Sequence, residues 1–182
     1  IIGTKSKSRR KLFKMMNLKF QYRSANINEK AVKNLKNDKY DALKIAKAKA
    51  MHLSKKNKNK IIITFDTTIL HMGRTIYKCH TKKCCKDTLI SFNNTTHNLY
   101  TGMVFMINNS LIKSRLTKTK IIFKKNNIVN INDYVEKNFK QISSSVGCYN
   151  IEGKGKSFFK NIEKSYYNVI GIDIINFLKI LK

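Results

Sequence analysis

The spacing of apolar residues predicts one amphipathic helix near the middle of the second half of the chain. Five apolar residues recur there every three or four positions: Ile131, Val135, Phe139, Ile142 and Val146. This period places them on one face of a helix. Asn132 stands where a helix N-cap is expected, and Gly147 stands where the helix would end. We therefore expect this helix to cover a sheet with its apolar face.

A thinner helical pattern runs over residues 28–51, with Asn28 as its N-cap. Its apolar positions form a narrow, alanine-rich stripe: Val32, Leu35, Ala42, Leu43, Ala46 and Ala50. The stretch is also basic, so two interpretations are open. The helix is either solvated and held by one narrow seam, or it lies along the phosphates of a nucleic acid. The net charge favours the second interpretation.

Shorter apolar runs predict strands. Residues 61–65 and 75–77 read as a short hairpin, and residues 88–100 read as a long strand that turns at Thr101-Gly102 into a partner strand over 103–108. Further strands are expected over 121–123, 148–151 and 169–174, with a helix over 158–166. The pattern predicts an α/β fold, with a mixed sheet of ribonuclease H-like topology and two covering helices.

Charge changes this picture at the N-terminal end. The chain has 38 Lys and Arg against 10 Asp and Glu, a net charge of +28 and a pI near 10.1. Such a chain is expected to bind a polyanion. Half of the basic residues lie in residues 1–60, which is too charged to bury a core of its own. We therefore expect residues 1–60 to be a basic N-terminal extension. Residues 61–87 are expected to be a hairpin or linker, which is a lineage-specific addition with respect to the family resemblance described below.

Residues 6–14 have the composition of a transit peptide or of an RNA-binding arm. We favour the arm, with Arg9, Arg10 and Lys11 on phosphates. The apolar runs are much shorter than the ~20 residues of a membrane span, so no membrane partner is expected. The lack of proline and tryptophan, with heavy use of Lys, Asn and Ile, is typical of an AT-rich genome and points to an organelle.

Two polar motifs stand out in residues 88–182. The first is Ser91-Phe92-Asn93-Asn94-Thr95. Its two asparagines are poor strand formers, and they indicate a bulge or an exposed face of the strand. The second is Gly153-Lys154-Gly155-Lys156-Ser157, which would offer backbone N–H groups to a phosphate. The second motif resembles the end of a nucleotide-binding P-loop, but that motif needs glycine at position 150, where this chain has Asn150. A plain flexible loop is the other interpretation.

The two motifs together resemble the universal small-subunit ribosomal protein eleven family, whose bacterial members carry Ser-Phe-Asn-Asn-Thr on a strand and a Gly-Pro-Gly-Pro-Gly loop later. The interval from Ser91 to Glu152 matches that family. The resemblance implies a ribosomal-protein-eleven-like domain over residues 88–182. It also implies a structural constituent of the mitochondrial small ribosomal subunit, or of a plastid-type one, that binds ribosomal RNA and neighbouring platform proteins.

Sixteen residues are the resulting RNA-binding candidates: Ser91, Asn93, Asn94, Thr95, Lys113, Arg115, Lys118, Lys120, Gly153, Lys154, Gly155, Lys156, Ser157, Arg9, Arg10 and Lys11. On this hypothesis the protein is not an enzyme and needs neither a cofactor nor a small-molecule substrate. A free-standing basic organellar protein that binds RNA or DNA is the alternative. A metal-dependent nuclease is disfavoured, because Asp87, Glu152 and Asp173 stand apart among lysines.

A cysteine-rich stretch supplies Cys79, His80, Cys84 and Cys85, which are residue types that bind zinc. Their spacing fits no standard zinc finger, and adjacent cysteines rarely bind one metal together. We therefore predict no metal, and we keep this set as the alternative. The other histidines, His52, His71 and His97, stand alone and are expected to be surface or structural residues.

Overall fold

The computed structural model describes residues 1–32 and 38–181, and these form an α/β fold around one mixed sheet of seven strands. Six strands follow the order β2-β1-β3-β5-β6-β7, and β4 pairs with β3 beside this path. The β1 strand pairs in parallel with β2 and β3, and the other pairs are antiparallel. The strand bounds are Ile2–Gly3 (β1), Tyr22–Arg23 (β2), Ile62–His71 (β3), Arg74–Ile76 (β4), Thr96–Ile107 (β5), Ser110–Phe123 (β6) and Phe159–Glu163 (β7).

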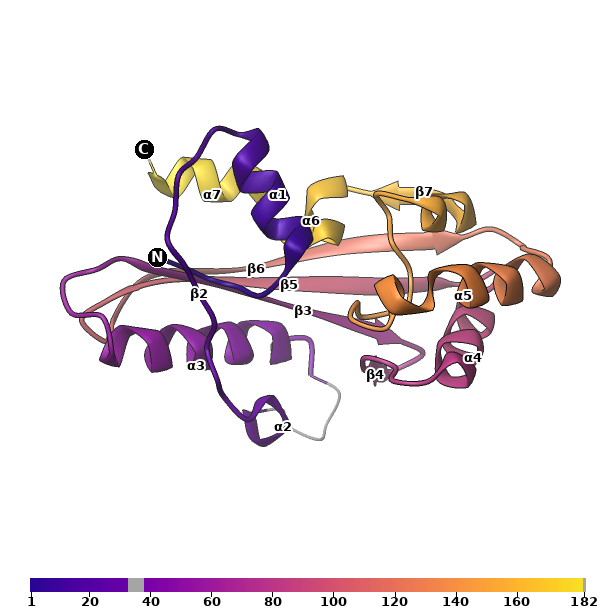
Figure 1. Ribbon diagram of the computed structural model, residues 1–182, viewed down its shortest axis with the longest axis horizontal. Helices are drawn as coiled ribbons and strands as arrows, with labels where there is room; N and C mark the ends of the chain where they lie inside the picture. The colour runs from indigo at the N-terminus through magenta and orange to yellow at the C-terminus, as the bar shows by residue number, and fades with distance from the viewer. Residues whose placement is uncertain (33–37, 182) are drawn as a thin grey trace.

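Helices cover both faces of this sheet (Figure 1). On one face lie α2 (Glu29–Val32) and α3 (Asp41–Lys55), and on the other lie α1 (Lys7–Met15), α6 (Tyr166–Ile170) and α7 (Ile174–Leu181). Helices α4 (Lys82–Phe92) and α5 (Ile128–Ile142) pack together at one end, and a short 3₁₀ helix, η1, spans Lys154–Phe158. None of the helices described here combines the length and the apolar character that crossing a membrane requires.

Three apolar clusters hold these layers together. The first joins α4 and α5 to the sheet through residues such as Leu89, Phe92 and Val135. The second packs Phe13 of α1 and Phe177 of α7 on Phe65. The third packs the alanine-rich stripe of α3 on β3 and β5. This stripe therefore faces the sheet, in agreement with the interpretation that one narrow seam holds the helix.

The alanine stripe lets α3 lie very close to β5. A Cβ atom built on Gly102 would stand 2.5 Å from the backbone oxygen of Ala42. Gly102 is in the middle of β5, so the expected turn at Thr101-Gly102 does not form. Glycine is required here because two backbones approach each other, rather than because the chain turns.

Residues 82–92 form helix α4 where a strand was expected over 88–100. Thr81 caps the helix by accepting a hydrogen bond from the Cys84 amide at 3.1 Å. Cys85, Leu89 and Phe92 are buried at helical spacing. Strand β5 begins only at Thr96. The cap and the buried face therefore outweigh the strand-like composition of this stretch.

The basic residues 113–120, which the sequence places between strands expected over 103–108 and 121–123, are themselves part of strand β6. Its outer edge pairs with β7 only from Lys120 to Phe123, so residues 110–119 have no partner strand on that side among the described residues. Charged side chains on such an edge prevent another chain from adding to the sheet. The cations of this stretch thus fit an edge strand.

The α/β class is confirmed, but the ribonuclease H-like topology is not. Helix α5 is confirmed, with Asn127 rather than Asn132 as its N-cap. Strands β3 and β4 do form a hairpin, but residues 69–71 of β3 pair with β4, rather than the predicted residues 61–65. Strands over 148–151 and 169–174 and a helix over 158–166 are wrong, since η1, β7, α6 and α7 occupy this region.

The predicted N-terminal extension is not confirmed either. Residues 1–60 supply β1 and β2 to the sheet, and they supply α1 and α3 to its two faces. The long helix expected over 28–51 is divided into α2 and α3, and Leu35 lies outside the described residues. The division at residues 60 and 87 into separate folding units stays a prediction.

Candidate functional site

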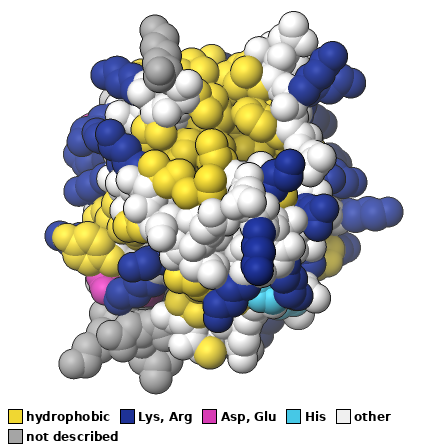
Figure 2. Space-filling view, turned by 90° about the vertical axis from the view of Figure 1, so that its left-hand side faces the viewer, with side chains coloured by type: hydrophobic (Ala, Val, Ile, Leu, Met, Phe, Trp, Pro, Cys, Tyr) yellow, Lys and Arg dark blue, Asp and Glu magenta, His cyan; other side chains and the backbone are white. Residues whose placement is uncertain are grey.

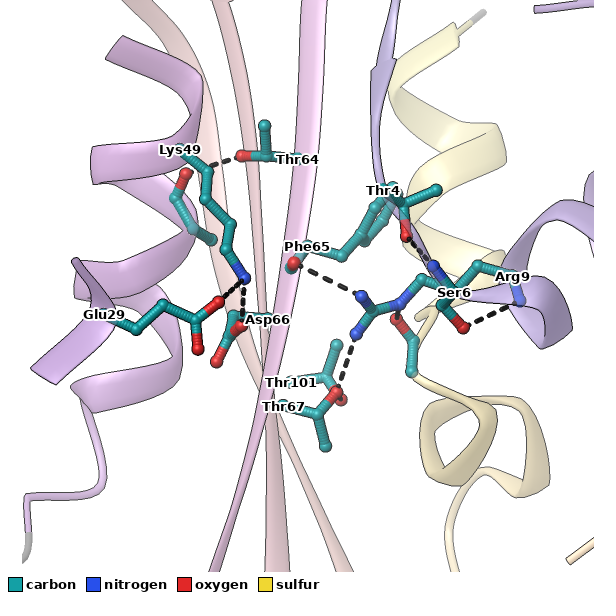
Figure 3. A network of polar contacts seen from close by, with 12 residues as sticks. Thr4, Ser6, Arg9, Glu29, Lys49, Thr64, Phe65, Asp66, Thr67 and Thr101 are labelled. Atoms are coloured by element: carbon teal, nitrogen blue, oxygen red, sulfur yellow. Dashed lines mark hydrogen bonds and ion pairs between the residues drawn. The ribbon is translucent and has the colours of Figure 1, made fainter. Parts of the chain in front are cut away.

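One edge of β3 is interrupted. Strand β5 pairs with β3 along Ile62–Leu70 on one side. On the other side, β1 pairs with Ile63 and Thr64, and β4 pairs with residues 69–71. Among the described residues no strand covers residues 65–68 between them. We call this uncovered stretch of β3 the β3 notch, and charged side chains gather around it (Figure 3).

Two carboxylates and one lysine meet on the α3 side of the β3 notch. The Nζ atom of Lys49 lies 2.6 Å from Oδ1 of Asp66 and 2.7 Å from Oε1 of Glu29. Three elements supply these groups: β3 supplies Asp66, α3 supplies Lys49, and the first residue of α2 is Glu29. Burial raises the pKa of Asp66, the ammonium of Lys49 opposes this rise, and the charge of Glu29 adds to it.

Arg9 occupies the opposite face of β3, because side chains at Asp66 and Thr67 alternate across the strand. Its Nε donates to the carbonyl oxygen of Gly171 at 2.9 Å, and its Nη2 donates to Oγ1 of Thr67 at 3.0 Å. Its Nη1 donates to the carbonyl oxygen of Phe65 at 3.4 Å. Burial lowers the pKa of Arg9, but a guanidinium stays protonated. Arg9 therefore joins α1, β3 and the C-terminal region by charged hydrogen bonds.

The N-terminus of helix α1 stands beside the β3 notch. Ser6 caps it by accepting a hydrogen bond from the Arg9 amide at 3.3 Å, and the Ser6 amide donates to Oγ1 of Thr4 at 3.1 Å. The first turn holds no acid, and it carries Lys7, Arg9 and Arg10. Cations at this end oppose the helix dipole. A bound anion would relieve this unfavourable charge arrangement.

A shallow, basic depression of about 370 Å³ runs along the same helix. Arg10, Lys11 and Lys14 line it together with aromatic residues of the following segment. The guanidinium of Arg10 lies 5.1 Å from the ring centroid of Tyr22. The residues that line this depression include basic side chains but no carboxylate. The carboxylates Glu29 and Asp66 lie at the β3 notch instead.

The structure places the first predicted motif, residues 91–95, at the end of α4 and the start of β5. The side chain of Asn93 donates to the Asn126 carbonyl at 2.9 Å and accepts from the Asn126 amide at 2.7 Å. Asn94 has a φ of 55°, as a turn residue. The hydroxyls of Ser91 and Thr95 donate to carbonyls of α4. The motif thus serves to end the helix.

The other predicted residues are distributed over the molecule. Lys113, Arg115, Lys118 and Lys120 lie along β6, and Lys120 pairs with Glu163 at 3.0 Å. The motif of residues 153–157 lies at η1, where the Ser157 hydroxyl donates to the Lys154 carbonyl at 2.8 Å. Of the sixteen candidates, Arg9 is the one whose contacts reach the β3 notch, and Arg10 and Lys11 lie on the same helix.

Sequence reasoning missed Glu29, Lys49 and Asp66. One signal was available for Asp66, which interrupts the apolar run of a strand that is otherwise buried. Lys49 lies within the alanine stripe, where its charge has to meet a partner. Glu29 gave no comparable signal, since it precedes a helix of four residues.

The fold and the β3 notch together define a class of protein. Carboxylates held by a lysine, next to a cationic helix N-terminus, are the groups of an acid–base site for an anionic substrate. Comparison with known proteins gives the family. The profile of the Maf-like protein family, Maf, matches residues 1–182, so the chain belongs to the Maf-like family.

Several relatives carry the name dTTP/UTP pyrophosphatase. The relative from Lacticaseibacillus casei is 26% identical over 181 residues, which is 100% of this chain and 96% of the relative. The relative from Clostridium tetani is 26% identical over 185 residues, or 100% and 95% of the two chains. The relative from Pyrococcus furiosus is 30% identical over 159 residues, or 87% of this chain and 81% of the relative.

This membership corrects the functional expectations from the sequence. The chain is not a member of the ribosomal protein eleven family, and the structural role on ribosomal RNA is wrong. The expectations of no enzymatic activity and no small-molecule substrate are contradicted as well, because the relatives are named as enzymes that act on nucleotides. The two motifs misled because their residues end a helix and form a 3₁₀ turn. The organellar location stays a prediction.

Proposed function

We propose that this protein is a nucleoside triphosphate pyrophosphatase that acts on dTTP, UTP or a closely related pyrimidine nucleotide. Water attacks the α-phosphorus, the bond from this phosphorus to the α–β bridging oxygen breaks, and pyrophosphate leaves. The observation that carries the proposal is the partly buried Glu29–Lys49–Asp66 network at the β3 notch. The names of the full-length relatives support the choice of substrate.

The phosphates of the nucleotide bind at the N-terminus of α1 in this proposal. The free N–H groups of a helix start and the nearby cations attract phosphate. Lys7 and Arg10 lie in this turn, and Lys11 and Lys14 follow on the same helix. These side chains neutralise the charge that the leaving pyrophosphate carries.

Asp66 accepts the proton of the attacking water. Its raised pKa makes it a better base than an ordinary aspartate, because proton transfer is most effective when the pKa is closer to the working pH. Lys49 holds the carboxylate in place, and the ion pair favours its ionised form. Arg9 is a positioning residue, since its hydrogen bonds fix the neighbouring backbone at Phe65 and the Thr67 side chain.

Glu29 and Asp66 are also the residues that would hold a divalent cation. Their oxygens lie on either side of one cationic Nζ, at 2.7 and 2.6 Å, so this position already favours positive charge. Carboxylates of this kind bind Mg²⁺ together with substrate phosphates. The cation would supply charge stabilisation to the phosphoryl oxygens.

The test is release of pyrophosphate from dTTP and UTP by the purified protein, compared with dATP and GTP at equal concentration. We expect activity on the pyrimidine nucleotides, and we expect Asp66→Asn to lower kcat by about 10²–10⁴-fold, as loss of a general base does. The control is Glu163→Gln, which removes a half-exposed carboxylate from an ion pair with Lys120 on β6. It should retain full activity.

Two results would count against the proposal. If the wild-type protein releases no pyrophosphate from any of the four nucleotides, the function is wrong. If Asp66→Asn is as active as the wild type, another group accepts the proton. Circular dichroism of each variant shows whether a loss of activity reflects loss of the fold.

A further inference from the structure

All four cysteines of the chain gather where α4 meets the end of α5. Cys79 precedes α4, Cys84 and Cys85 lie in its first turn, and Cys148 follows α5. The Sγ atoms of Cys79, Cys85 and Cys148 all lie within 4.8 Å of one another. These three residues are buried in the apolar cluster of this end of the molecule, and Cys84 is exposed.

Cys79 has two alternative partners in this arrangement. Its sulfur forms a disulfide with Cys84, across a Cα–Cα distance of 5.4 Å. The same sulfur faces the free thiols of Cys85 and Cys148. When the disulfide is opened, the three buried thiols of Cys79, Cys85 and Cys148 lie together, and they come from three separate segments of the chain.

A hydrogen-bond donor lies beside these sulfur atoms. The Thr88 hydroxyl is 3.4 Å from the sulfur of Cys79. Donors of this kind stabilise metal-bound thiolates as outer-shell partners. The positive end of α4, whose first turn carries no acid, adds to this effect.

Burial without a metal favours the neutral form of a thiol. A soft cation displaces the thiol protons and becomes the counter-charge of the thiolates. The first half of α4 also carries Lys82 and Lys86, which form ion pairs with Glu136 of α5 at 2.5 and 2.8 Å.

We propose that the reduced protein binds one Zn²⁺ ion through Cys79, Cys85 and Cys148, and that the Cys79–Cys84 disulfide prevents this binding because it takes the sulfur of Cys79. Opening the disulfide takes two electrons and two protons from a dithiol reductant and yields two thiols. Binding of Zn²⁺ then releases three protons from the three ligand thiols. Three thiolates leave the fourth position of the tetrahedral geometry that is usual for zinc to a water molecule.

His80 takes no part in this site, which differs in this respect from the set considered from the sequence alone. Its side chain is exposed and is absent from the group of sulfur atoms. Cys148 replaces it as a ligand. The distance of Cys148 from the other cysteines in the sequence hides this ligand until the chain is folded.

The first experiment titrates Co²⁺ into dithiothreitol-reduced, desalted protein under argon and follows the visible absorption of tetrahedral thiolate coordination. We expect one equivalent to bind and to be displaced by Zn²⁺. Cys85→Ser and Cys148→Ser should each weaken binding at least tenfold. His80→Ala is the matched control and should bind as the wild type does. Binding that is equal in Cys148→Ser and wild-type protein would overturn the proposal.

Serine variants of buried cysteines can fail to fold, so a second measurement uses only the wild-type protein. Native mass spectrometry compares reduced and oxidised samples after incubation with zinc acetate. The mass of one zinc ion should be present on the reduced protein and absent from the oxidised protein. Zinc on both forms, or on neither, contradicts the proposal. Neither readout depends on nucleotide hydrolysis.

Discussion

Lys49 stands between two carboxylates, and at the residue scale this position controls the charge of the β3 notch. Burial alone would favour a neutral Asp66, whereas the ammonium group 2.6 Å away favours the ionised form. Because folding raises the Asp66 pKa, the ionised carboxylate costs folding free energy at neutral pH. This cost is absent below the ordinary pKa of aspartate. Such a cost is expected for a residue retained for chemistry.

His97 provides a prediction about stability and pH. Its ring is 1% exposed, its Nε2 lies 3.0 Å from the Tyr149 hydroxyl, and its centroid lies 4.2 Å from that of Phe92. Burial lowers its pKa from 6.5 to about 3, and the charge of His71 adds to the effect. Below pH 6.5, His97 therefore binds a proton in the unfolded chain but stays neutral in the folded chain.

Stability should consequently fall as the pH drops from 6.5 toward 3, by about 1.4 kcal/mol per pH unit from this one group. Urea unfolding of wild-type and His97→Phe protein at several pH values in this window measures the difference in slope. The slope should be shallower in the variant by about this amount, and His80→Ala should keep the wild-type slope. Parallel slopes for wild-type and His97→Phe protein would refute the prediction.

At the scale of elements, local patterns predicted those pieces whose burial is simple. The apolar spacing of α5 and the strand character of β3 were visible because each buries one continuous set of residues. Helix α4 was missed although Thr81, Leu89 and Phe92 mark a cap and a helical face. Two asparagines after it suggested a strand motif instead. Residues 110–120 of strand β6 were missed because an edge strand tolerates charges that a central strand excludes.

The β3 notch lay beyond what such patterns can predict. Glu29, Lys49 and Asp66 belong to three elements, and each residue alone is an ordinary charged side chain. They meet because α3 packs so closely on the sheet that Lys49 reaches the uncovered edge of β3. This packing depends on the alanines of α3 and on Gly102 of β5, which lies far from them in the sequence. Their contact exists only in the folded chain, so the sequence pattern does not reveal it.

Gly102→Ala tests this close packing. The new Cβ would lie 2.5 Å from the Ala42 carbonyl oxygen, a backbone atom that cannot rotate away. We expect a loss of about 1–3 kcal/mol in unfolding free energy, as overpacking causes. Activity should fall too, since α3 carries Lys49.

Gly153→Ala is the control, because the atom nearest to a Cβ built on Gly153 is the side-chain amide nitrogen of Asn150, at 3.2 Å. The control should change stability by less than about 0.5 kcal/mol. Equal unfolding free energies for wild-type and Gly102→Ala protein, measured by urea titration, would argue against the role of this contact.

At the scale of the whole molecule, the net charge of +28 acts against the compact state. Figure 2 shows one end of the molecule, where Lys and Arg side chains surround an apolar area. Salt shortens the range of this repulsion from about 10 Å at 0.1 M to about 3 Å at 1 M. The melting temperature should therefore rise between 0.1 M and 1 M NaCl.

Calorimetry at the two salt concentrations measures the effect. The double variant Lys113→Gln, Lys118→Gln removes two cations from strand β6. Its melting temperature should depend less on salt than that of the wild type. A melting temperature that is constant or falls with salt would show that the ion pairs outweigh the repulsion.

The hydrogen bond from Arg9 to the Gly171 carbonyl joins positions 162 residues apart. During synthesis on the ribosome, the N-terminal part of the chain emerges long before position 171 is made. Helix α1 and strand β1 are therefore made before the Gly171 carbonyl that accepts the hydrogen bond from Arg9. Because domains generally fold as units, α1 cannot reach its final packing until that residue is available. A growing chain stopped before residue 171 would thus hold the three charged residues of the β3 notch and still lack this contact. If the proposed function holds, full activity is expected only after residue 171 has been made and has left the ribosome.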